Sequence, residues 1–221
     1  MKGKMLLGLT AILMLTGAAV PVKADDVWKF DAQRFVLKEY TGTETDVVVP
    51  DTMDEGVPVK RLGTQLLAGS ETLTSVVVPD SVTILDVGAL SYDNNLSEIT
   101  LSSNLINIGW NAISSNDALT ELTIPASVCI IDSYAVSGCY ALKKIVFEGA
   151  CPLIGSEAFV MLSDDVVIYV PDDQIEEYKK VFEENNKNLN IQPSGKPAVL
   201  YSAEDYLDTE NLTFDAETGS I

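Results

Sequence analysis

The stretch LTSVVVPDSVTILDVGALSYDNN (residues 73–95) is followed without a gap by three more blocks of 23 residues. They read LSEITLSSNLINIGWNAISSNDA (96–118), LTELTIPASVCIIDSYAVSGCYA (119–141) and LKKIVFEGACPLIGSEAFVMLSD (142–164). A less regular copy from Glu44 to Thr72 precedes them, lengthened by a loop near residues 54–56, and another copy begins at Asp165. Six copies at one period predict a solenoid in which each copy forms one coil.

The first half of each copy predicts a short strand, because two apolar positions flank one outward position. Proline follows this strand in four copies and cannot donate to a ladder, so it should end the strand at the same point each time. The inward residues lie at position 4 (Val47, Val76, Ile99, Leu122, Ile145, Ile168) and at position 6 (Val49, Val78, Leu101, Ile124, Phe147, Val170).

The second half of each copy has its own inward residues at positions 10 and 13, while position 14 is always Gly or Asp. Gly and Asp tolerate turn and left-handed backbone, so we expect the chain to bend at position 14. Identical register should make the strands parallel and about 4.8 Å apart. The sequence therefore predicts an α/β-type repeat solenoid, a right-handed coil stack with one face of its parallel sheet open to solvent.

The N-terminal 24 residues have the pattern of a secretory signal. Lys2 and Lys4 precede an uncharged apolar run from Met5 to Val20, and Val22-Lys23-Ala24 offers small residues for cleavage after Ala24. The run is shorter than the roughly 20 apolar residues that a membrane span needs. We therefore expect a secreted or surface-associated mature chain with no membrane insertion.

The mature chain is expected to form one domain with a cap at each end. Residues 25–43 predict an N-terminal hairpin and residues 44–171 the solenoid of about six coils. Residues 172–193 predict a capping helix and strand, with Asp172 and Asp173 as candidate helix N-caps. Residues 194–221 carry six acids and one Lys with little periodicity, which predicts an acidic flexible tail.

The columns resemble the BspA-like leucine-rich-repeat family of bacterial surface and secreted proteins, whose pattern runs roughly L-x-x-I-x-I-P-x-S-V-x-x-I-G-x-x-A-F-x-x-C. The resemblance covers about residues 36–193 and implies a leucine-rich-repeat fold and adhesion. Leu90, Ile113 and Val136 replace the usual Phe, and no sorting motif ends the chain. The third block matches the pattern directly at Leu119, Leu122, Ile124, Pro125, Ser127, Val128, Ile131, Ala135 and Cys139.

Composition argues against several functions. All 33 acidic residues, but only 11 of the 14 Lys and Arg, lie beyond residue 24, which gives the mature chain a net charge of −22. Such a surface repels nucleic acid and anionic lipid. The chain has no His, no nucleophile elbow and no phosphate-binding glycine loop, so we expect no enzyme activity and no cofactor.

Metal and cysteine chemistry are weakly indicated. The acids lack the spaced loop of a calcium site, and a solvated acidic surface explains them better. Cys129 and Cys151 lie in adjacent coils but one position out of register, so they should face opposite ways. Cys139 occupies an inward column, and buried free thiols behave as small hydrophobes.

Two surfaces are candidate binding sites. The open sheet face should present positions 3 and 5, where Glu121 can pair with Lys144 across adjacent coils, although an ordinary strand ladder explains these residues equally well. On the turn side, Trp110 stands in a column of small residues beside Tyr134, which suggests an aromatic patch or simply a ring lying over its neighbour. The open-face candidates are Glu98, Thr100, Glu121, Thr123, Lys144 and Tyr169.

These features favour a non-catalytic adhesion module, acting as a monomer, that engages a protein or glycan partner. A structural spacer within a larger envelope protein is the alternative, and an inhibitor or decoy that uses the same face is a third hypothesis. The sequence does not identify the partner.

Overall fold

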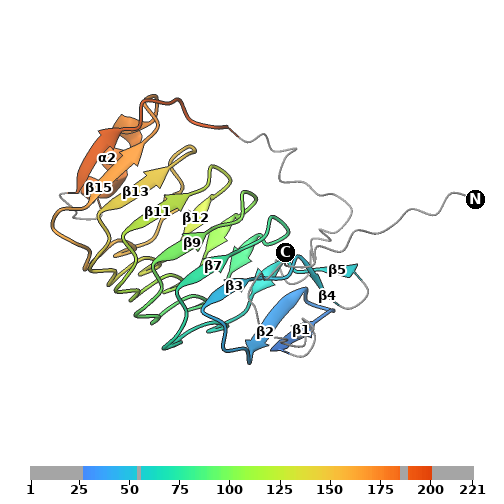
Figure 1. Cartoon of the computed structure of the whole chain (residues 1–221). Helices are drawn as coiled ribbons and strands as arrows, with labels where there is room; N and C mark the ends of the chain where they lie inside the picture. The colour runs from blue at the N-terminus through green and yellow to red at the C-terminus, as the bar shows by residue number, and fades with distance from the viewer. Residues whose placement is uncertain (1–26, 54–55, 185–188, 201–221) are drawn as a thin grey trace, which may run out of the picture.

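The computed structural model describes residues 27–53, 56–184 and 189–200, so the expected signal segment lies outside the described residues. These residues form a β-solenoid of about seven turns with a 23-residue period (Figure 1). Partners in neighbouring front strands are 23 residues apart, as in Glu121–Lys144 and Lys144–Val167. The front strands are β3 (Asp46–Val48), β7 (Ser75–Val77), β9 (Glu98–Thr100), β11 (Glu121–Ile124), β13 (Lys144–Phe147), β15 (Val167–Val170) and β16 (Asn190–Pro193).

The return half of each coil contributes a two-residue strand, and residues 59–170 contain no helix. The repeat is therefore all-β, which refines the α/β-type expectation. The expected strand near Ile191, β16, adds a seventh member to the front face, because it pairs in parallel with β15. The return strands are β6 (Arg61–Leu62), β8 (Ile84–Leu85), β10 (Asn107–Ile108), β12 (Ile130–Ile131) and β14 (Leu153–Ile154).

Each coil has two left-handed residues, and neither is at position 14. Positive φ angles occur at position 16, as in Tyr134 (61°), and at position 20, as in Tyr92 (63°). Our expectation of left-handed backbone at position 14 was wrong. Gly109 is required there for another reason, because a Cβ atom would lie 2.5 Å from the carbonyl oxygen of Leu85 in the preceding coil.

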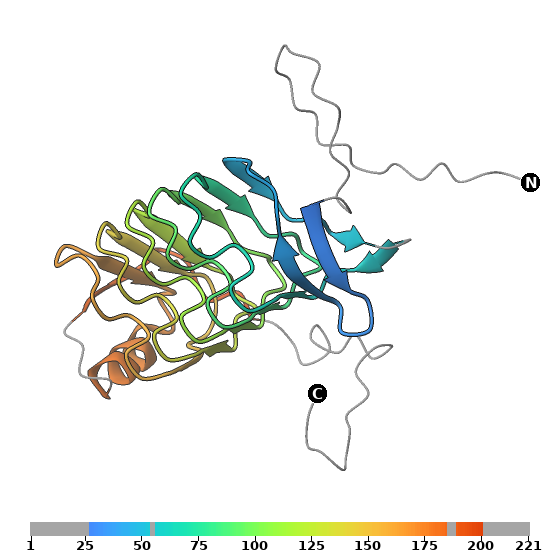
Figure 2. The ribbon, with the colours of Figure 1, turned by 90° about the horizontal axis from the view of Figure 1, so that it is seen from below.

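The N-terminal cap is the predicted hairpin, β1 (Trp28–Asp31) and β2 (Val36–Tyr40). The Trp28 and Tyr40 rings pack together across the two strands with centroids 4.3 Å apart. Strand β2 also pairs in parallel with β6, so the hairpin begins the return sheet (Figure 2). A small antiparallel pair, β4 (Thr52–Met53) and β5 (Val57–Pro58), flanks the predicted loop.

The C-terminal cap is helix α2 (Ile175–Glu184), which buries Tyr178 and Phe182 against the last coils. Tyr178 and Phe147 have ring centroids 4.9 Å apart, and the Tyr178 hydroxyl donates to the carbonyl of Gly149 at 3.2 Å. An aromatic plug therefore covers the apolar end of the stack, which would otherwise face water.

The expected N-cap role of Asp172 and Asp173 was wrong. The Tyr178 amide donates to the carbonyl of Gln174, so the first helical hydrogen bond begins there. The two aspartates instead accept backbone amides of Gly195 and Ala198, each at 2.8 Å. Their carboxylates fix the segment after β16 and not the helix.

The return strap, defined as residues 194–200, corrects the expectation of a flexible tail from residue 194. It runs back over the carboxyl ends of the front strands, where the Asp172 amide donates to Lys196 and the Val199 amide donates to Glu148, each at 2.9 Å. A backbone bridge joins Val199 to Gly149. The rest of the expected tail, residues 201–221, lies outside the described residues.

The predicted inward columns are buried. Positions 4 and 6 are at most 9% exposed in every described coil, with Ile124 at 1% and the adjacent Thr123 exposed. Strand β11 therefore alternates as the sequence predicts. No single coil could hide these side chains, so each is stabilised by the coils above and below it.

A polar column runs through the core at position 21, where the family pattern has Cys. Asn116 donates from its side-chain amide to the carbonyls of Leu90 and Ile113 and accepts the Asp93 amide at 3.0 Å. Asp93 in turn accepts the Ser70 amide at 2.6 Å through Oδ1. This column satisfies backbone groups at the turn and ties each coil to the next.

Asp93 is the exception in this column because its second carboxylate oxygen, Oδ2, is buried without a hydrogen-bond partner among the described residues. Burial raises the pKa of Asp93 to about 7, although the Ser70 and Gly69 amides oppose this effect. By the repeat, Oδ2 takes the place of the Asn116 amide nitrogen, which donates to carbonyls. A protonated Asp93 or an asparagine fits this place better than a carboxylate.

The column assignment predicts the effects of two neighbouring substitutions. Ile124→Asp buries a charge without a partner and should lower the free energy of unfolding by about 4 kcal/mol or abolish folding. Thr123→Asp places the same group on the open face and should cost less than about 1 kcal/mol. Urea unfolding followed by circular dichroism measures both, and equal damage from the two variants would contradict the assignment.

Asp93 predicts a pH-dependent stability difference. The folded pKa is raised above the unfolded value, so its contribution is complete below about pH 4 and is lost as the pH rises to about 7. Asp93→Asn should therefore increase stability by about 2 to 4 kcal/mol at pH 8 and far less at pH 4. Thermal unfolding at both pH values tests this, with Asp117→Asn as a control for the loss of one exposed charge. A gain of the same size at both pH values would exclude ionisation of Asp93 as its cause.

Candidate binding surfaces

The open sheet face is formed by positions 3 and 5 of the front strands. Glu98, Thr100, Glu121, Thr123 and Lys144 are exposed on it, while Tyr169 is half-buried. All six predicted residues therefore lie on one side of the front sheet, in the adjacent strands β9, β11, β13 and β15. They are held by the backbone ladder and not by a loop, so the surface is ordered before any partner arrives.

Charge is unevenly distributed along this face. The Lys144 ammonium lies 2.8 Å from a carboxylate oxygen of Glu121, as predicted, and this contact raises the pKa of Lys144. Asp46 accepts hydrogen bonds from Ser75 and Thr74, which lower its pKa. Glu98 has no side-chain hydrogen bond or ion pair with another described residue. Glu98 is therefore the acid on this face whose charge is most available to a ligand.

The hydrogen-bond ladder of the front face is interrupted between β9 and β11. Strands β3, β7 and β9 form one ladder, and β11, β13, β15 and β16 form another, although β9 and β11 remain in contact. The candidate residues Glu98 and Thr100 thus lie on one side of this interruption and Glu121 and Thr123 on the other. The periodicity of the sequence did not predict the interruption.

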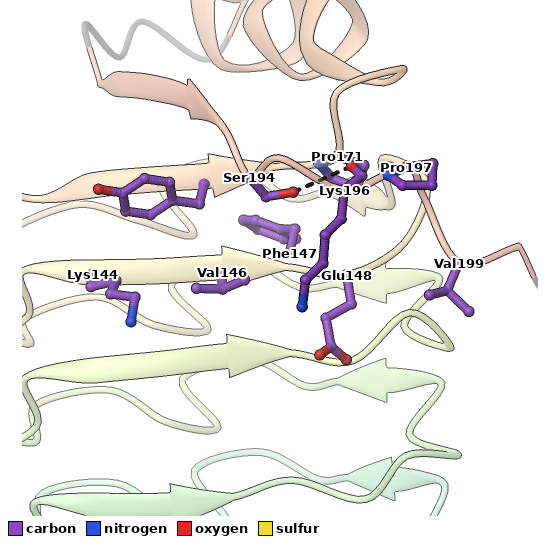
Figure 3. A pocket seen from close by; sticks show the side chains of 10 residues that line it. Lys144, Val146, Phe147, Glu148, Pro171, Ser194, Lys196, Pro197 and Val199 are labelled. Carbon is purple, nitrogen blue, oxygen red and sulfur yellow. Dashed lines mark hydrogen bonds between the residues drawn. The ribbon is translucent and has the colours of Figure 1, made fainter.

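The return strap adds a wall to the C-terminal end of the open face. Together with β13 and β15 it encloses a trough of about 500 Å³ (Figure 3). Val146, Tyr169 and Lys144 belong to the sheet side of the trough, while Lys196, Pro197 and Val199 come from the strap. Sequence reasoning identified Lys144 and Tyr169 but missed the strap residues, because that segment has no repeat or motif.

The predicted aromatic patch also forms. The Trp110 side chain is 48% exposed, and its ring meets the Tyr134 ring edge to face with centroids 6.3 Å apart. A hydrogen bond from Tyr134 to Glu157 raises the pKa of the tyrosine. The patch is built on turns next to the return strands, away from the open face. The two candidate surfaces are therefore separate.

The cysteines do not pair among themselves. All three are free thiols, with Cys129 exposed, Cys139 buried and Cys151 partly buried against the core. Cys129 and Cys151 therefore differ in exposure as their columns predict. Burial raises the pKa of Cys139 to about 11, so this thiol stays protonated and acts as an apolar filler.

Within residues 27–53, 56–184 and 189–200, no helix is long and apolar enough to cross a membrane. The same residues contain no group of three or more Cys, Asp or Glu side chains placed to hold a metal ion. The described surface thus offers exposed side chains and one walled trough, and these features suit contact with a partner.

Comparison with solved structures finds several bacterial leucine-rich-repeat proteins. A leucine-rich-repeat protein from Bacteroides capillosus is 36% identical and covers 52% of this chain and 86% of its own, with a TM-score of 0.46. A leucine-rich cell surface protein from Faecalibacterium prausnitzii is 21% identical and covers 82% of this chain and 40% of its own, with a TM-score of 0.50. The pneumococcal vaccine antigen PcpA is 16% identical, with coverages of 81% and 49% and a TM-score of 0.54.

A search of curated proteins found no match. The family model for the BspA-type leucine-rich-repeat region matches residues 60–190 with six copies, which is more than half of the chain. This range includes the coils, the aromatic plug and the strands of the open face. The chain belongs to the BspA-type leucine-rich-repeat family.

Proposed function

We propose that this protein is a secreted or surface-displayed adhesion module that binds a protein or glycan partner through its open sheet face, without chemical turnover. The observation that carries the proposal is the row of exposed side chains on β9, β11 and β13, held in place by a continuous core. A ligand that docks on pre-ordered side chains loses little conformational entropy.

The charge on the open face supports a polar contact. Glu98 is exposed and has no ion-pair partner among the described residues, while Glu121 is exposed and shared with Lys144. An exposed ion pair contributes at most about 1 kcal/mol, so Glu121 can exchange Lys144 for a ligand cation at low cost. The centre of the face therefore suits a partner that carries cationic or hydrogen-bond donor groups.

The turn-side patch is the second candidate surface. Trp110 is half exposed and supported by Tyr134, and exposed aromatic side chains often dominate binding energy. It shares no residues with the open face, so substitutions can separate the two surfaces. The spacer hypothesis is different from both, because it requires no specific ligand on either surface.

Glu98→Lys combined with Glu121→Lys should weaken the partner at least tenfold and leave the Tm nearly unchanged, because both carboxylates are exposed. The mature chain is first screened against purified matrix proteins and a glycan array, and the affinity of each ligand found is then measured by biolayer interferometry. Glu183→Lys with Glu184→Lys makes the same charge change on α2 and should not affect binding.

Trp110→Ala tests the competing surface with the same ligand. Unchanged binding by Trp110→Ala supports the open face. Loss of binding in Trp110→Ala, with binding retained by the double charge reversal, would assign the function to the aromatic patch. Absence of any ligand in both screens would favour the spacer role.

A further inference from the structure

The trough at the C-terminal end of the open face differs from the rest of that face in charge. Asp46, Glu98 and Glu121 make the earlier strands acidic, whereas Lys144 and Lys196 both line the trough. In Figure 3 the two lysines lie on opposite sides of Val146. A trough with two ammonium groups is a local positive feature on a chain of strongly negative net charge.

The two lysines are not equivalent. Lys144 is paired with Glu121 at 2.8 Å, so part of its charge is compensated. Lys196 is exposed and has no ion-pair partner among the described residues, although Glu148 also lines the trough. The Lys196 backbone is fixed, because its carbonyl accepts the Asp172 amide at 2.9 Å. The strap therefore holds an uncompensated cation over the edge of the sheet.

The remaining lining is mainly aliphatic. Val146, Pro171, Pro197 and Val199 surround the space between the lysines, with the half-buried Tyr169 at one side. A volume of about 500 Å³ falls within the range of ordinary ligand sites and holds a few residues of a peptide. The trough thus combines anion recognition with apolar contact.

We propose that this trough binds an extended acidic peptide segment of a partner protein, with a carboxylate on Lys196 and a neighbouring apolar side chain against Val146, Pro197 and Val199. The inference rests on the proposed function and specifies the partner chemistry at one end of the open face. An extended peptide presents alternate side chains in opposite directions, so acidic and apolar residues of one segment can reach different walls.

The lining favours a peptide over an acidic glycan. Sugar rings are commonly held by an exposed aromatic face, but Tyr169 is half-buried and the other apolar groups are aliphatic or proline. The exposed Trp110 lies on the other candidate surface. Aliphatic and proline side chains instead suit the Val, Leu or Ile residues of a peptide.

The test uses the mature chain and a fluorescein-labelled peptide of alternating Asp and Leu residues, with an Asn-for-Asp peptide as the neutral control. Fluorescence anisotropy should show binding of the acidic peptide only. Lys196→Glu should weaken it at least tenfold, while Lys180→Glu, the same change at an exposed position on α2, should leave it unchanged.

A second variant should act in the opposite direction. Glu121→Gln removes the carboxylate that compensates Lys144 and should tighten acidic-peptide binding by about two- to threefold, as expected for the loss of a weak exposed ion pair. A gain of affinity cannot result from misfolding, so this variant tests the trough independently of the loss in Lys196→Glu.

Equal binding of the neutral peptide, or no effect of Lys196→Glu, would overturn the proposal. Oligogalacturonate that binds through Lys196 more tightly than the peptide would replace it with a glycan site. If the natural partner is weakened by the Glu98 and Glu121 reversal but no acidic peptide binds, the trough proposal fails and the proposed function stands.

Discussion

The structure depends on registered burial of apolar columns between coils that cannot fold alone. Front strands of three or four residues and return strands of two are too short to be stable in isolation. Each inward side chain, such as Ile124, becomes buried only when Phe147 lies beside it in the next coil. The 23-residue period is therefore a physical requirement, since a different spacing would place apolar and outward positions side by side.

Function follows from departures from this regularity. The repeat builds a flat open face, but its interior coils alone would give a ladder of similar side chains. Glu98 without a partner, Trp110 in a column of small residues, and Lys196 on the return strap each break the pattern at the surface. The core tolerates these changes because none of the three side chains is part of it. Binding chemistry can therefore vary on this scaffold while the stack is maintained.

Much of the fold could be predicted because its determinants are local and repeated. The burial of Leu122 and Ile124, the open position of Thr123 and the Glu121–Lys144 pair all follow from column position. The strap could not be predicted, since its hydrogen bonds join Asp172 and Asp173 to amides more than twenty residues later without a sequence period. The protonation preference of Asp93 was also missed, because it depends on how completely the neighbouring coils exclude water.

The central claim is that one coil of 23 residues is the unit of stability, and internal deletions test it most directly. Removal of residues 119–141 joins Ala118 to Leu142 and leaves every remaining column in register. Removal of only the front half of that coil, residues 119–130, leaves a return strand with no front strand. Thermal unfolding followed by circular dichroism should show a cooperative transition for the larger deletion, with a Tm lowered by several degrees, and no cooperative transition for the smaller one. Equal loss of structure in both, or a better-folded protein from the smaller deletion, would contradict the account.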